Sequence, residues 1–356
     1  MKICVVTVYN GSNYGARLQA LALKHVLEEK GHTVTHVETK ARNPRSRAVK
    51  KIIKRLITFD WRKDSLKFQW DIGSLFVREA KEFDVCSIQE ASDADLVIFG
   101  SDEIWNVRRK MIYQYPVLFG KGIENDCKAS YAVSINDATV EDFNKRPFSI
   151  EEIGKFKKIT VRDQYSKEVL SSLLPEYEIA TVVDPTFLPE RSFYEEIMEE
   201  TELESYILIY SYGNHLTEDA MNQIQEFAKK KNLKLISVLG YFAWCDYNTP
   251  CSTKKVLGLF KNAKYVFTDT FHGAIFSMLF EKNFVIISKG TKKLDILLNI
   301  YSLEGRKIKP SERMVETIAN QAIDYVSFNQ KREELRSNSL VELDAILDLK
   351  SECKNG

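Results

Sequence analysis

The sequence has no long apolar run, no excess of one charge and no closely spaced pair of cysteines. No stretch approaches the about 20 consecutive apolar residues of a membrane-spanning helix, so no transmembrane segment is expected. Lysine and arginine (51) nearly balance aspartate and glutamate (50), and the net charge therefore points to no particular partner. The apolar run at the start of the chain is too short for a signal peptide, so we expect a cytoplasmic protein.

The six cysteines are scattered over 356 residues and form no C-x-x-C pair. None has a histidine at the spacing of a zinc site. This pattern predicts reduced thiols, with neither a disulfide framework nor a bound metal.

Strand-like and helix-like segments alternate along the chain, which is typical of βα units around a parallel sheet. The expected strands of the first half are 3–8, 33–38, 94–99, 159–162 and 179–183, with a helix at 15–30. The expected strands of the second half are 206–210, 235–239, 265–268 and 284–288, with helices at 217–230, 253–262 and 273–281. We therefore predict an α/β protein of two Rossmann-like domains with parallel sheets, GT-B-like, with the active site in the interdomain cleft.

The boundary between the predicted domains falls where Asp184 precedes Pro185. Because proline prevents a helix from continuing, these residues indicate a turn at a hinge. The prediction assigns residues 1–185 to the first domain, 186–326 to the second and 327–356 to a C-terminal helical segment.

Ligands bind open parallel sheets beyond the carboxyl ends of the strands, so the residues after each strand are the candidates for function. Asn13, Tyr14 and Gly15 follow the first strand, in a loop that permits a close backbone approach to a ligand. The alternative there is a turn that caps the helix. Arg162 ends an apolar strand, where it either bridges a neighbouring carboxylate (Asp163 or Asp184) or presents its planar fork to an anion.

A second polar loop follows the strand at 94–99. It places Ser101, Asp102 and Asn106 around Trp105. A serine or aspartate there could simply cap a helix. The density of polar groups beside a tryptophan favours a functional loop instead.

The strongest candidate is His272, which stands between Thr268-Asp269-Thr270 and Gly273 at the start of a helix. A histidine at the mouth of a βα loop can donate to a phosphate or act as acid and base near neutral pH. A lone histidine is more often structural, but the other four (25, 32, 36 and 215) lack this context. We therefore expect His272 to be functional.

Five blocks, in order over roughly residues 1–300, resemble the polysaccharide pyruvyl transferase family. They are Asn13-Tyr14-Gly15-Ala16-x-Leu18-Gln19, Gly100-Ser101-Asp102-x-x-Trp105-Asn106, Val161-Arg162-Asp163, Val183-Asp184-Pro185-Thr186-Phe187 and Thr268-Asp269-Thr270-Phe271-His272-Gly273. Each block alone is modest support, whereas all five in order are specific.

The resemblance implies transfer of pyruvate from phosphoenolpyruvate to two hydroxyls of a glycan sugar as a cyclic ketal, with release of phosphate, in exopolysaccharide or cell-surface glycan biosynthesis. It implies His272 as the acid and Asp102 as the base, and phosphoenolpyruvate as co-substrate without metal or cofactor. The expected donor-binding residues are Arg162, Asp269, Thr270, Gly273 and Lys289. The expected acceptor-binding residues are Asn13, Tyr14, Gly15, Ser101, Trp105 and Asn106.

One position departs from the family pattern. Family members carry an arginine two residues before the histidine, where this chain has Thr270. Threonine carries no charge, so Lys289, Lys292 or Arg306 is expected to compensate if the donor is phosphoenolpyruvate. The alternatives are a GT-B glycosyltransferase using a nucleotide sugar and a non-catalytic glycan-binding relative.

A basic segment precedes residue 64. Between Lys40 and Lys63 there are ten lysines and arginines and a single acid, Asp60. Apolar residues at helical spacing predict an amphipathic helix at about 46–58. Such a helix could lie on the inner face of an anionic membrane, where a lipid-linked oligosaccharide acceptor would reside, or pack on its own domain. Nucleic acid is not expected, because aromatic residues are not interleaved with the charges.

Overall fold

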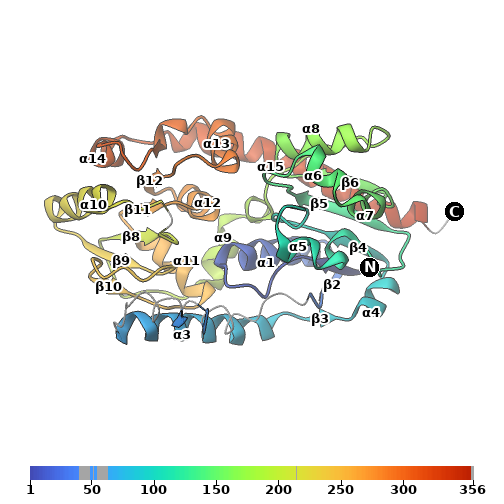
Figure 1. The fold of residues 1–356 in the computed structure, drawn as a ribbon, viewed down its shortest axis with the longest axis horizontal. Coiled ribbons are helices and arrows are strands. Elements are labelled where there is room, and N and C mark those ends of the chain that lie inside the picture. Colours follow the sequence, from blue (N-terminus) through green and yellow to red (C-terminus); the bar gives the residue numbers. More distant parts are fainter. Residues whose placement is uncertain (40–48, 51, 54–62, 214, 354–356) are drawn as a thin grey trace. The chain divides into compact units, whose positions relative to one another are not determined.

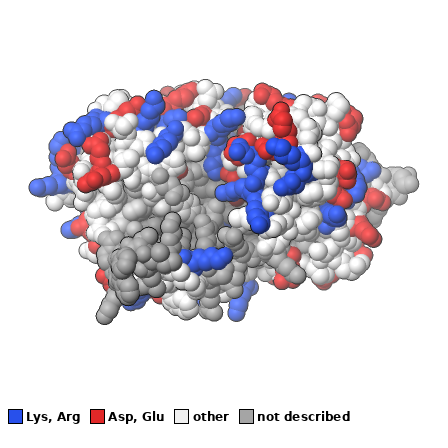
Figure 2. Space-filling model, viewed as in Figure 1, with Lys and Arg blue, Asp and Glu red and all other residues white. Residues whose placement is uncertain are grey.

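The chain folds into two compact units in the computed structural model, which describes residues 1–39, 49–50, 52–53, 63–213 and 215–353 (Figure 1). Unit 1 comprises residues 1–41, 80–189 and 332–356, and unit 2 comprises 42–79 and 190–331. On the face drawn in Figure 2, basic and acidic side chains are interspersed, as the small net charge leads one to expect.

Unit 1 is built on a seven-stranded parallel sheet in the order β3-β2-β1-β4-β5-β6-β7. The strands are β1 (Lys2–Val6), β2 (Thr33–Val37), β3 (Val85–Cys86), β4 (Leu96–Phe99), β5 (Lys128–Val133), β6 (Lys158–Val161) and β7 (Ala180–Thr181). Every residue of β4 and β5 is buried, as in central strands covered on both faces. The main helices are α1 (Tyr14–Glu29), α4 (Ile88–Ser92), α5 (Lys110–Tyr113), α6 (Val140–Asn144), α7 (Pro147–Ile153) and α8 (Gln164–Leu173).

Unit 2 is built on a six-stranded parallel sheet in the order β10-β9-β8-β11-β12-β13. The strands are β8 (Tyr206–Tyr210), β9 (Lys234–Ser237), β10 (Tyr247–Asn248), β11 (Tyr265–Thr268), β12 (Asn283–Ile287) and β13 (Lys307–Ile308). The helices are α3 (Lys63–Glu79), α9 (Arg191–Ile197), α10 (Glu218–Lys231), α11 (Thr253–Asn262), α12 (Phe271–Leu279), α13 (Lys292–Ile300) and α14 (Val315–Asn320).

Helix α10 shows how the local sequence determines where a helix begins and ends. The side chain of Thr217 caps its first turn by accepting from the Ala220 N–H, and two acids follow the cap. Three lysines lie in its last turn, where cations suit the helix dipole. Asn232 then ends the helix in the left-handed conformation, with φ of +53°.

Helix α15 (Tyr325–Cys353) returns the end of the chain to unit 1. The Ser339 hydroxyl accepts from the Val183 N–H at 3.0 Å, and Lys350 pairs with Asp95 at 2.7 Å. A disulfide joins Cys353 to Cys127, whose Cα atoms are 5.9 Å apart.

The prediction that all six cysteines are reduced thiols is therefore wrong for this pair. The two cysteines are 226 residues apart, and only the return of α15 brings them together. Cys4, Cys86, Cys245 and Cys251 are buried and form no disulfide within the described residues.

The predicted strands and helices correspond to elements of the structure within a few residues, but the two-residue strands β3, β10 and β13 and the longer central strand β5 were not predicted. The sequence of β5, KASYAV, has small and polar residues in place of an apolar run. These polar groups are satisfied by the neighbouring strand, since the Ser130 hydroxyl donates to the Thr160 carbonyl at 3.0 Å.

Most of the predicted amphipathic segment at 46–58 lies outside the described residues. Of that segment the structure describes 49–50 and 52–53, which are helical. Among the residues that are described, no helix is both long and apolar enough to cross a membrane.

Candidate functional site

Each sheet has one point where the strand order reverses direction, between β1 and β4 in unit 1 and between β8 and β11 in unit 2. Phe99 is opposite Val6, and Thr268 is opposite Tyr210. The loops that follow these strands therefore start side by side at the carboxyl edge of each sheet, where open α/β sheets bind ligands.

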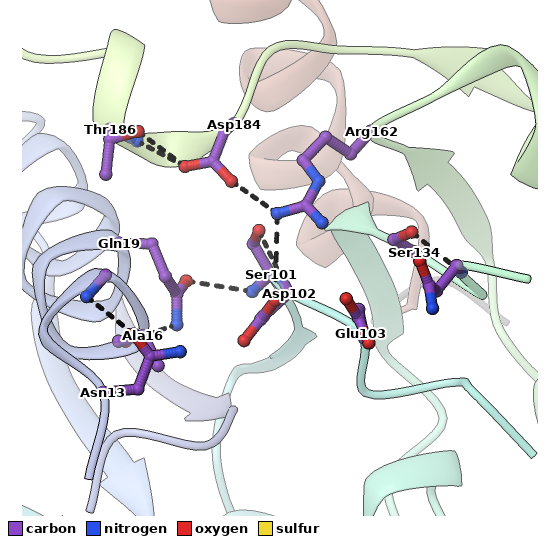
Figure 3. A network of polar contacts seen from close by, with 12 residues as sticks. Asn13, Ala16, Gln19, Ser101, Asp102, Glu103, Ser134, Arg162, Asp184 and Thr186 are labelled. Carbon is purple, nitrogen blue, oxygen red and sulfur yellow. Dashed lines mark hydrogen bonds and ion pairs between the residues drawn. The ribbon is translucent and has the colours of Figure 1, made fainter. Parts of the chain in front are cut away.

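In unit 1, Gln19 joins the two loops at this point. Its amide nitrogen donates to the Thr7 hydroxyl at 2.9 Å. Its amide oxygen accepts from the Ser101 N–H at 3.2 Å (Figure 3). Thr7 in turn donates to the Ser101 carbonyl at 3.3 Å. This network, with Gln19 and Ser101 fully buried, fixes the loop that carries Asp102.

The loop from Gly100 to Asp102 has an unusual backbone. Gly100 has φ of +138°, and a Cβ there would lie 1.9 Å from the Tyr131 carbonyl oxygen. Asp102 itself has φ of +73°, and its carbonyl accepts from the Ser134 N–H at 3.0 Å. Only glycine fits at position 100, and the Asp102 side chain remains 22% exposed, so the loop presents a carboxylate.

Arg162 directly follows β6 and points into the same network (Figure 3). Its guanidinium donates to Asp184 at 2.7 Å and lies 3.9 Å from Asp102 (Figure 3). Burial works against the charged form, but the carboxylates of Asp184 and Asp102 raise the pKa of Arg162 above its ordinary value. Of the roles left open for Arg162, the structure shows the bridge to Asp184. The other oxygen of Asp184 accepts from the N–H and hydroxyl of Thr186.

The remaining predicted residues of unit 1 have structural contacts. Asn13 caps α1 by accepting from the Gly15 N–H at 3.0 Å. Tyr14 and Trp105 are fully buried in the core, and the Trp105 indole donates to the Leu118 carbonyl at 3.0 Å. Asn106, also buried, donates to Asp137 at 3.3 Å. In these contacts the predicted residues hold the loops around Asp102 in place.

In unit 2, the loop after β11 is organised by two threonines. The Thr268 hydroxyl donates to the Tyr210 carbonyl at 2.7 Å and lies 3.0 Å from the Thr270 hydroxyl. Thr270 caps α12 by accepting from the Gly273 N–H at 2.9 Å. A Cβ at Gly273 would lie 2.1 Å from the Thr268 hydroxyl oxygen, so the glycine is required for this arrangement.

Asp269 and His272 lie within this loop. Asp269 is 8% exposed, its Oδ1 accepts from the Tyr212 N–H at 3.2 Å, and its buried Oδ2 has no hydrogen-bond partner among the described residues. Burial raises the pKa of Asp269, although hydrogen bonds from Ser211 and Tyr212 and the charge of nearby His215 oppose the shift. His272 is 6% exposed, and its ring lies edge-on to the Phe271 ring with 5.4 Å between the two ring centroids.

His215 lies at the same edge, although it was not among the predicted site residues. It follows β8, and its Nδ1 accepts from the Lys289 N–H at 3.2 Å in the loop after β12. The pairing of β8 and β12 on either side of β11 thus brings three loops together. A histidine in the loop between a buried strand and a capped helix was the signal in the sequence.

Lys289, Lys292 and Arg306 were expected to supply the positive charge that Thr270 lacks, and they lie in different places. Arg306 is buried and donates to the backbone carbonyls of Phe284 and Gln321, at the start of β12 and away from this edge. The Lys289 side chain is exposed, as is that of Lys292. Lys293, which was not among the predicted residues, has its Nζ 6.0 Å from the centre of the Phe271 ring.

No group of three or more histidine, cysteine or acidic side chains among the described residues is placed to hold a metal ion.

The carboxyl edge of unit 1 offers a carboxylate beside a buried arginine. That of unit 2 offers a histidine, a buried carboxylate and a lysine at the start of a helix.

The sequence profile described as "Polysaccharide pyruvyl transferase" matches residues 13–289, well over half of the 356 residues. The chain belongs to the polysaccharide pyruvyl transferase family. No curated protein is significantly similar to it in sequence.

Solved structures related to this pyruvyl transferase family member share its fold at low identity. UGT89C1 from Arabidopsis thaliana complexed with UDP has a TM-score of 0.53 at 11% identity, covering 97% of this chain and 98% of that one. UDP-GlcNAc 2-epimerase from Neisseria meningitidis bound to UDP-GlcNAc has a TM-score of 0.51 at 12% identity, covering 96% and 100%. The prediction of two parallel-sheet α/β domains of GT-B type is confirmed.

Proposed function

We propose that this member of the family transfers pyruvate from phosphoenolpyruvate to two hydroxyls of a glycan sugar, giving a cyclic ketal and phosphate. The observation that carries the proposal is His272 beside Asp269 at the start of α12, in the matched span of the family. The donor carries a carboxylate and a phosphate, and the positive end of a helix favours such anions.

The first step adds one sugar hydroxyl across the C2=C3 double bond of the donor. A C2–O bond forms, His272 gives a proton to C3, and Asp102 takes the proton of the hydroxyl. The negative charge of Asp269 stabilises the positive charge that develops at C2. In the second step the other hydroxyl bonds to C2 as the C2–O bond to phosphate breaks, and its proton leaves with phosphate. The proton on Asp102 returns to His272 through water, so no oxidant or reductant is needed.

The acceptor we propose is a sugar or lipid-linked oligosaccharide of exopolysaccharide or cell-surface glycan biosynthesis. We place the reaction in the cytoplasm. Segment 46–58 is proposed as a peripheral contact with the inner face of the membrane, where a lipid-linked acceptor would be held.

The direct test is phosphate release from phosphoenolpyruvate with candidate glycans, together with mass spectrometry of the glycan for an added pyruvate ketal. We expect release only when both substrates are present. Donor binding is tested separately by thermal shift, since a ligand at a hundred times its Kd adds about 2.7 kcal/mol to the free energy of unfolding. If phosphoenolpyruvate does not stabilise the protein and no glycan promotes phosphate release, the proposal is contradicted.

A second candidate is a glycosyltransferase using a nucleotide sugar, because two solved neighbours are described with UDP or UDP-GlcNAc bound. Stabilisation by UDP-sugars but not by phosphoenolpyruvate would favour it. A chain that binds glycan but neither donor would be a non-catalytic relative.

A further inference from the structure

A pocket of about 620 Å³ opens in unit 1 at the start of β5. Its lining includes Lys128, the first residue of β5, and the loop that leads into this strand. Asp102 follows the carboxyl end of β4, which runs parallel to β5 with Val97 opposite Lys128. The pocket therefore lies at the amino edge of the sheet, opposite the edge that carries Asp102, and is separate from the site described above.

One wall of the pocket is held in place by Asn125. Its amide nitrogen donates to the carbonyls of Ser92 and Ala94, at 3.1 and 2.8 Å. Its amide oxygen accepts from the N–H of Cys127 at 2.7 Å, and Cys127 is joined by the disulfide to Cys353. A wall that is fixed before a ligand arrives reduces the entropy lost on binding.

Lys128 contributes a buried ammonium group. The residue is 6% exposed, and its Nζ donates to the Ile123 carbonyl at 3.2 Å. Within the described part of the chain this is the one hydrogen bond of the ammonium, which carries three N–H donors. Burial lowers the pKa of Lys128, and the charges of Glu152 and Asp126 only partly oppose this shift. A further oxygen acceptor beside the ammonium would therefore stabilise its charged form.

The charges that line the pocket nearly balance. They belong to Lys128, Lys155, Glu124, Asp126 and Glu152. A free anion would meet three carboxylates, one of which is already paired with Lys155 at 3.0 Å. The described residues place no group to hold a metal ion, and Ile123 is the one apolar side chain of the lining. The lining suits a neutral ligand with many hydroxyls, because a hydroxyl donates to a carboxylate and accepts from an ammonium.

We propose that this pocket binds sugar units of the acceptor glycan away from the hydroxyls that react; the identification of the ligand as the acceptor rests on the proposed function. One sugar hydroxyl accepts from the Lys128 ammonium, and others donate to the carboxylates of Glu124 and Asp126. A long glycan held at the amino edge stays on the protein while its remaining sugars reach the carboxyl edge. This second contact raises the effective concentration of the acceptor at the reaction site.

Hydrogen exchange of the full-length protein, measured by mass spectrometry, tests the site with neutral tetrasaccharides of glucose, galactose and mannose as probes. We expect at least one probe to slow exchange in peptides that cover residues 120–128. Lys128→Met keeps the apolar stem and loses the ammonium. It is expected to raise the probe concentration needed for half of this protection about tenfold or more, the loss of one charge-assisted hydrogen bond. Lys157→Met is the matched control and should change nothing, because it removes an exposed lysine that does not line the pocket.

Asp126→Ala is a second variant and is expected to weaken the same probe, while the exposed position of Asp126 leaves folding intact. Protection confined to residues 100–106 would place the sugar at the candidate reaction site, so that the pocket is wrong while the proposed acceptor stands. Protection at 120–128 that depends on Lys128, without phosphate release from phosphoenolpyruvate, would leave the pocket standing and contradict the proposed reaction. No protection by any of the three tetrasaccharides, or equal protection in wild type and both variants, overturns the pocket.

Discussion

The guanidinium of Arg162 donates to the Asp184 carboxylate at 2.7 Å, and the two side chains are 4% and 2% exposed. This buried pair joins the end of β6 to the segment that leaves unit 1, and it lies beside Asp102. Removing one member leaves the other charge in a site that water does not reach.

Asp184→Ala is therefore expected to lower the free energy of unfolding by about 3–5 kcal/mol in urea titrations. Glu195→Gln is the control, because it breaks the more exposed Arg191–Glu195 pair. That change is expected to cost about 0–1 kcal/mol. Equal effects of the two substitutions would show that the buried pair is not held as described.

His272→Ala is expected to remove nearly all turnover, while His272→Asn retains donor binding but little activity. Asparagine can imitate a hydrogen bond to the donor but cannot release a proton to C3, and general acid catalysis contributes about 10²–10⁴-fold. Steady-state phosphate release and calorimetry measure the two properties separately. His32→Asn in unit 1 is the control. An Asn variant with full turnover would reduce His272 to a positioning residue.

Thr270→Arg is expected to tighten phosphoenolpyruvate binding and to lower stability. The substitution adds a cation at the start of α12 but removes the cap on the Gly273 N–H, which is worth about 1 kcal/mol. Thr270→Ser, which keeps the cap without adding charge, should change neither property appreciably. Unchanged donor affinity in the arginine variant would indicate that the cations already present suffice.

Gly273→Ala is expected to disturb the loop that holds His272. The new methyl group would lie 2.1 Å from the Thr268 hydroxyl oxygen, which is itself bonded to Tyr210, so strand or helix must shift. Overpacking of this kind costs about 1–3 kcal/mol. Gly305→Ala is the control, since a Cβ there meets no atom within 4 Å. Thermal unfolding and turnover of the pair decide whether the glycine is required.

His36 is expected to make the protein less stable in acid. Burial, assisted by the charge of Lys24, lowers the pKa of His36 to about 3, while the unfolded chain has a histidine pKa of about 6.5. Between these values only the unfolded state binds the proton. This contribution to stability is therefore lost as pH falls through the window, at about 1.4 kcal/mol per pH unit.

Urea unfolding of wild type and His36→Phe at several values between pH 7 and pH 4 measures this contribution as a difference. The phenylalanine suits the ring cluster of Tyr9 and Phe83 and has no proton to bind. We expect the free energy of unfolding of wild type to fall more steeply with decreasing pH than that of His36→Phe. Parallel curves for wild type and His36→Phe would contradict the assignment.

Much of the fold followed from local sequence. Apolar runs such as Tyr206–Tyr210 and Tyr265–Thr268 gave strands, and the turn at Asn13 gave the start of α1, because burial and hydrogen bonding at these places involve neighbours in the chain. The same patterns placed Asp102 and His272 after strands. Strand β5 was not predicted, because its polar groups are satisfied by hydrogen bonds with β6, which lies about 30 residues further along the chain.

The sequence by itself determined the family, the two parallel-sheet domains and the loops that hold Asp102 and His272. Tertiary structure decided which charges meet. Strand order brings His215 and Lys293 to the edge that carries Asp269 and Arg162 to the edge near Asp184, while the return of α15 joins Cys127 to Cys353. These relationships depend on distances between segments remote in the chain, whereas hydrophobic periodicity and caps report only on residues a few positions apart.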